Sequence, residues 1–148
     1  MKKRVLTTIV LIILAMFIIG STCFAKNYAI SFTLYPNGAS QYSGQGVKGD
    51  NDTKCYITTT GGTAISNNLT YRLRAKAVGW NGNSPTYANA TTLGAFYGKI
   101  TSKTLTYIDP YYTQIKNGNY ASYKFVLAAS LHSGTPANNY TISGKWNP

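Results

Sequence analysis

Residues 69–80, LTYRLRAKAVGW, alternate between apolar and polar side chains over most of their length. The apolar or aromatic positions are Leu69, Tyr71, Leu73, Ala75 and Ala77. The positions between them are Thr70, Arg72, Arg74 and Lys76. A period of two is the side-chain period of a β-strand, so the pattern predicts one buried face and one face that carries three cations.

Short segments with a strand pattern recur along the chain, and most of them are closed by Gly, Asn, Pro or Ser. They lie at 27–35, 53–60, 69–78, 102–108, 120–130 and 139–146. Residues 86–100 mix strand patterns with glycines, residues 41–52 have the composition of a loop, and no long stretch has helical periodicity. Six to eight short strands separated by turn residues predict an all-β fold, a single antiparallel β-sandwich or barrel-like domain.

The N-terminus has the three-part layout of a secretory signal peptide. MKKR precedes the uncharged run VLTTIVLIILAMFIIG (5–20), and STCFA (21–25) follows it. The alternatives are a retained membrane anchor, for which the run is shorter than the roughly 20 residues that a span needs, and a lipoprotein cleaved before Cys23. We expect cleavage after Ala25, a secreted or wall-associated domain over residues 26–148, and no transmembrane span after cleavage.

Basic residues greatly outnumber acidic ones. The chain has 14 Lys and Arg against three acidic residues, and three of the basic residues precede residue 26, which leaves eleven against three, a formal +8. Such a charge favours anionic partners, although it also promotes solubility. There is no nucleic-acid-binding motif, so the expected partner is an anionic cell-wall polymer or a membrane surface and not a nucleic acid.

Side chains suited to catalysis are few. Residues 26–148 contain one His, one Cys, three Asp and no Glu, whereas glycosidases need paired carboxyl groups and metal sites need clustered ligands. Cys55, His132 and Asp109 would supply a triad, but none lies in a nucleophile motif. Asp50 and Asp52 lack the ligands that continue a calcium loop. We therefore expect no enzyme activity, no cofactor and no metal site, with Cys55 a small buried hydrophobic residue.

The candidate binding residues are Arg72, Arg74, Lys76 and Trp80. Cations two apart on one strand face lie roughly 6–7 Å from each other, close to the phosphate repeat of an extended polyanion. Trp80 follows this strand in GWNGNSP and is the best candidate among the aromatic residues for an exposed contact. Most of the 13 tyrosines are expected to pack across strands. The alternative is that the cations only keep a sheet face soluble.

The C-terminal sequence YKFVLAASLHSGTPANNYTISGKWNP resembles a family of small secreted proteins of Gram-positive bacteria that end in Y-T-x-S-G-x-W-x-P. The matching residues are Tyr140, Thr141, Ser143, Gly144, Trp146 and Pro148. An earlier Y-x-L-x-A, at Tyr71, Leu73 and Ala75, is also similar. The family is uncharacterised, so the resemblance implies secretion and a β domain but no catalytic residue.

Two classes of function follow from these features. The first is a non-enzymatic cationic protein that binds an anionic cell-envelope polymer or surface glycan. The second is a bacteriocin-like antimicrobial protein that acts on the membranes of competitors. Membrane-active segments usually form an amphipathic helix with a cationic face, and this chain has strand patterns instead. The sequence therefore favours the first class.

Overall fold

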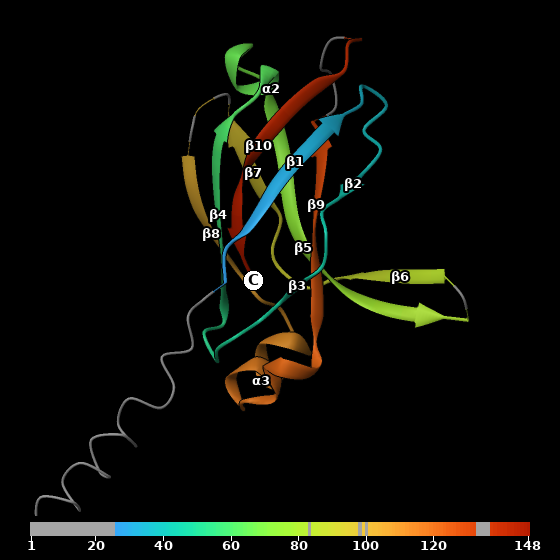
Figure 1. Cartoon of the computed structure of the whole chain (residues 1–148), viewed down its shortest axis with the longest axis vertical. Helices are drawn as coiled ribbons and strands as arrows, with labels where there is room; N and C mark the ends of the chain where they lie inside the picture. The colour runs from blue at the N-terminus through green and yellow to red at the C-terminus, as the bar shows by residue number, and fades with distance from the viewer. Residues whose placement is uncertain (1–25, 83, 98, 100, 133–136) are drawn as a thin grey trace, which may run out of the picture.

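The computed structural model describes residues 26–82, 84–97, 99, 101–132 and 137–148. The expected signal peptide, 1–25, lies outside the described residues. The described part is an all-β fold with two antiparallel sheets (Figure 1), which confirms the predicted class. Eight of its ten strands have four residues or more, and the other two have only two residues each.

The first sheet has four strands in the order β1-β10-β4-β8. These are β1 (Tyr28–Leu34), β10 (Tyr140–Asn147), β4 (Lys54–Gly61) and β8 (Thr101–Thr106). β1 alternates as predicted, because Ile30, Phe32 and Leu34 are buried and the residues between them are exposed. The N-terminal and C-terminal strands are therefore neighbours in one sheet.

The second sheet has six strands, with the order β2-β9-β5-β6 along its main path and β3 on β9 and β7 on β5. Its central strands are β5 (Thr70–Asn81) and β9 (Lys124–Leu131). The outer strands are β2 (Gln41–Tyr42), β3 (Gly46–Val47), β6 (Ser84–Asn89) and β7 (Gly94–Tyr97). β5 and β6 form a hairpin that projects from the body of the domain (Figure 1).

Among the described residues, three short helical segments connect the strands: α2 (Thr63–Ser66), α3 (Tyr111–Lys116) and the 3-10 helix η1 (Asn119–Ser122). Asp109 precedes α3 and accepts hydrogen bonds from the backbone N–H and the hydroxyl of Thr113. Segments of one or two turns are too short to leave a helical period in a sequence, which is why the pattern did not predict them.

β5 supplies the centre of the core, as its alternation predicts. Tyr71, Leu73 and Ala75 are fully buried. In β9, however, Val126 and Ala128 are buried together with the inward-facing residues of that strand. Lys76 lies opposite Val126 in the pairing of β9 with β5. The outer face of β9 is therefore partly covered by long neighbouring side chains, which a simple alternation did not anticipate.

The C-terminal motif has structural roles. Trp146 is fully buried and Tyr140 is 8% exposed. The pairing of β10 with β4 shifts between Ser143 and Gly144. A Cβ at Gly144 would lie 2.1 Å from the carbonyl oxygen of Thr58, so no larger residue fits this close approach of two strands.

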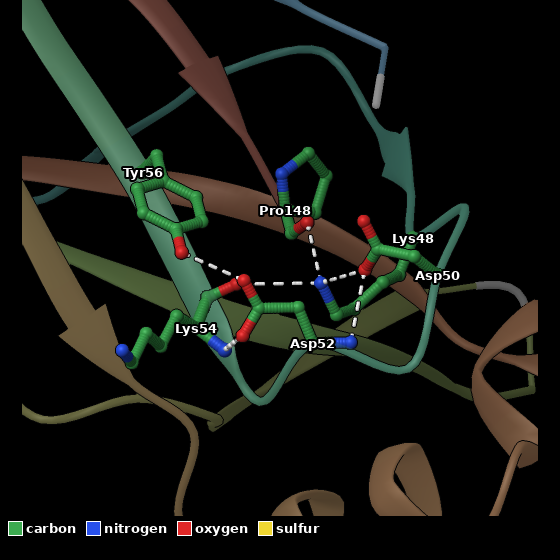
Figure 2. A network of polar contacts seen from close by, with 6 residues as sticks. All are labelled: Lys48, Asp50, Asp52, Lys54, Tyr56 and Pro148. Carbon is green, nitrogen blue, oxygen red and sulfur yellow. Dashed lines mark hydrogen bonds and ion pairs between the residues drawn. The ribbon is translucent and has the colours of Figure 1, made fainter. Parts of the chain in front are cut away.

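A buried lysine fixes the loop before β4 (Figure 2). Lys48 is 2% exposed, and its ammonium donates to Asp50 at 2.8 Å, to the carbonyl oxygen of Pro148 at 2.9 Å and to that of Lys54 at 3.3 Å. It also lies 5.5 Å from the centre of the Tyr107 ring. These contacts compensate the burial of the charge and tie the loop to the end of β10.

The two carboxylates in this loop extend the network (Figure 2). Asp50 accepts from the backbone N–H of Asp52 at 3.1 Å. Asp52 in turn accepts from the backbone N–H of Lys54 at 3.1 Å and from the hydroxyl of Tyr56 at 2.7 Å. These are turn contacts of the kind that Asx residues make, so the GDND segment has a structural role.

Candidate functional site

Arg72, Arg74 and Lys76 point to the outer face of the six-stranded sheet, opposite Tyr71 and Leu73. All three cations are half-buried, whereas the sequence predicted an open strip. They line a hollow of about 290 Å³, which we call the basic hollow after these three residues. The side chains are half-buried because neighbouring segments form walls on both sides of the strand.

Small side chains on β9 leave the space for the basic hollow. Ala128 lies opposite Arg74, and Ser130 lies opposite Arg72, in the pairing of β5 with β9. Both small residues line the hollow. Larger residues at these two positions would fill the space beside the guanidinium groups.

The other walls come from segments outside the β5–β9 pair. Asn89 lies opposite Lys76 at the end of β6, and Leu93 precedes β7 and is 47% exposed. Ser40, from the segment between β1 and β2, completes the lining. The hollow therefore combines three cations with polar and apolar groups from four separate parts of the chain.

The three aspartates are engaged elsewhere. Asp50 pairs with Lys48, Asp52 accepts from Tyr56, and Asp109 accepts from Thr113. Over the part of the chain that the structure describes, Lys48–Asp50 is the one ion pair. The three cations of the basic hollow thus lie close together without a carboxylate partner among the described residues, and like charges placed side by side on a sheet repel one another.

Two features distinguish Arg74 and Lys76 from freely solvated cations. The Nε of Arg74 is buried and has no hydrogen-bond partner among the described residues. The ammonium of Lys76 lies 5.5 Å from the centre of the Tyr42 ring, and Tyr42 stacks on Tyr87 with ring centres 4.3 Å apart. Lys76 therefore lies beside an aromatic pair from β2 and β6 at one end of the basic hollow.

Trp80 is the predicted site residue that the structure does not bring to the basic hollow. It is 66% exposed and lies opposite Pro85 in the projecting β5–β6 hairpin. It lies four positions beyond Lys76 along the strand, a distance of roughly 13 Å. It is absent from the lining of the hollow, so any contact that it makes is separate.

Cys55 does not have the environment of a nucleophile. Its side chain is fully buried, and this burial raises the pKa of the thiol to about 12, although the charge of Lys48 acts in the opposite direction. The thiolate is the nucleophilic form, and at neutral pH Cys55 is protonated. The prediction of a small buried residue is confirmed.

Among the described residues, no group of three or more His, Cys, Asp or Glu side chains is placed to hold a metal ion. None of the helices in the described ranges has the length and apolar character that crossing a bilayer requires.

Comparisons with known proteins leave the chain without an assigned family. No family model matches it, and no curated protein sequence matches it. A solved structure described as "Crystal structure of PirA" has a TM-score of 0.39 and 10% sequence identity, and the match covers 84% of this chain and 99% of that chain. At this TM-score the likeness supports no conclusion about function. The resemblance to the secreted Gram-positive family stays a prediction.

Proposed function

We propose that the protein is a secreted, non-enzymatic binding protein that holds an anionic cell-wall polymer through the basic hollow. The observation that carries this proposal is the convergence of Arg72, Arg74 and Lys76 on one hollow without a carboxylate partner among the described residues. Half-burial reduces the hydration of these cations, and an anionic ligand would compensate both that loss and their repulsion.

A purely solubilising role fits these residues less well. Solubility requires charge at the surface but no particular arrangement, and exposed lysines such as Lys54, Lys116 and Lys145 already supply it. The cations of the basic hollow are instead half-buried and placed at two-residue intervals on a central strand. Aggregation at an edge strand is also not the reason, because β5 is paired on both sides.

The test compares two triple variants of equal net charge. One carries Arg72→Gln, Arg74→Gln and Lys76→Gln, and the control carries Lys54→Gln, Lys116→Gln and Lys145→Gln. Both are applied to isolated cell walls at low and moderate salt, with circular dichroism to verify the fold. We expect the first variant to lose most of its retention and most of its salt dependence, because the three cations that would pair with the anionic polymer are gone. The control should keep most of both.

Two outcomes would contradict the proposal. The first is equal retention of the hollow variant and the parent protein. The second is binding to vesicles of anionic phospholipid in preference to walls, which would favour the membrane-acting alternative. The exposed Trp80 on the projecting hairpin is the feature that supports this alternative, since tryptophan suits membrane interfaces.

A further inference from the structure

We propose that the basic hollow recognises one phosphate ester of a small polyol or sugar, so that a polymer is bound by single repeating units. This inference rests on the proposed function and narrows it to a ligand chemistry. The same chemistry exists in phosphate-containing wall polymers and in phospholipid headgroups, and we assign the wall polymer as the source.

The size of the basic hollow limits how much of a polymer it holds. Its volume of about 290 Å³ lies just below the roughly 300–1,000 Å³ that is typical of small-molecule sites. Ala128 and Ser130 on one side and Asn89 and Leu93 on the other border it. An extended chain lying flat on the sheet would not need a bordered hollow, whereas one phosphate with its attached polyol matches its size.

The number of donors favours phosphate over carboxylate. The guanidinium group of a single arginine can donate hydrogen bonds to both oxygens of a carboxylate. In the basic hollow two guanidinium groups and one ammonium line the same space, and a phosphate has more oxygens to share among them. The buried Nε of Arg74 has no partner in the described structure. An anion that draws this guanidinium toward itself would give that N–H an acceptor.

The neutral part of the lining suits the polyol. Ser40, Ser130 and Asn89 offer hydroxyl and amide groups, which donate to and accept from sugar or glycerol hydroxyls. Leu93 supplies an exposed apolar surface at the rim for the C–H groups of the same unit. The lining therefore matches a ligand with one strongly anionic end and one uncharged, hydroxylated end.

The experiment titrates the intact domain by calorimetry with glycerol phosphate, inorganic phosphate and glucuronate at constant ionic strength. We expect saturable binding of one glycerol phosphate per chain, with glucuronate weaker by about tenfold or more. Glycerol phosphate should also release the protein from isolated walls. Anionic phospholipid vesicles, which present the same headgroup chemistry, should compete less well than soluble wall polymer.

Two variants test the hollow without removing a cation. Ala128→Leu fills the space, and its control is Ala29→Leu on the exposed face of β1. Leu93→Asp places a negative charge at the rim, where Leu93 is 47% exposed, and its control is Ala29→Asp on the exposed face of β1 in the other sheet. Each hollow variant should weaken glycerol phosphate binding by about tenfold, and each control should leave it unchanged. If Ala128→Leu does not fold, Leu93→Asp decides the question.

The outcomes separate this inference from the proposed function. If the polymer binds through the three cations but small phosphate esters neither bind nor displace it, the single-unit inference is wrong and the proposed function stands. Glucuronate binding as tightly as glycerol phosphate would also overturn the choice of phosphate. Wall retention that is independent of the three cations would overturn both proposals.

Discussion

Cys55 and Tyr107 are two titratable groups that the core keeps neutral. Burial raises the pKa of Cys55 from 9.0 to about 12, and it raises the pKa of Tyr107 in the same direction. The folded state therefore binds the thiol proton more tightly than the unfolded chain does. The resulting stability is fully present below about pH 9 and is lost as the pH rises toward 12, by about 1.4 kcal/mol for each pKa unit of difference.

We predict that Cys55→Ala flattens the fall of stability between pH 9 and pH 11. The substitution removes one of the groups whose proton the fold retains, although the cavity that it leaves lowers stability at every pH. Urea denaturation at a series of pH values measures the slope. A parent-like slope in the variant would show that the thiol is not responsible, and in that case Tyr107 remains as the source.

The sequence predicted the burial of single residues only where the local pattern of the strand indicates it. The place of Cys55 in a β-branched strand indicates burial, and the structure confirms it. Lys48, in a glycine-rich loop, has no comparable signal. Its ammonium is buried because Pro148, 100 residues away in sequence, supplies one of its acceptors. Such a contact depends on the fold and leaves no mark in the sequence around the lysine.

At the scale of elements, β10 depends on its glycine. We predict that Gly144→Ala destabilises the protein by roughly 1–3 kcal/mol, the usual cost of overpacking, because the new Cβ would lie 2.1 Å from a carbonyl oxygen of β4. The control is Gly44→Ala, where the Cβ meets nothing within 4 Å. Thermal melting of both variants is the measurement. If Gly144→Ala melted at the same temperature as Gly44→Ala, β10 and β4 would accommodate the added methyl group at little cost in stability.

The period of β5 predicted both faces of that strand, but it did not predict the basic hollow. Arg72 and Arg74 follow from alternation alone. The space beside the arginines depends on which strand lies next to β5 and in which register it pairs. Ala128 and Ser130 leave this space because they lie opposite the arginines. Trp80 shows the converse, since nearness in sequence to the cations did not bring it into the hollow.

At the scale of the whole molecule, the acids and the clustered cations are segregated. Asp50 and Asp52 belong to the loop before β4, and Asp109 precedes α3, while Arg72, Arg74 and Lys76 share the basic hollow. Composition predicted an excess of positive charge but not its distribution. The fold concentrates part of this excess at one place, which is why a charge-matched control variant is informative.

The projecting β5–β6 hairpin has a consequence for self-association. β6 is the last strand on its side of the sheet, and a free strand edge can pair with the same edge of another copy. Pro85 interrupts that edge, because proline has no N–H to donate and in sheets is confined to such positions. We predict that Pro85→Val makes the protein associate in a concentration-dependent way, whereas Thr86→Val on the same strand does not. Sedimentation velocity distinguishes these outcomes, and a monomeric Pro85→Val variant would show that something other than proline protects the edge.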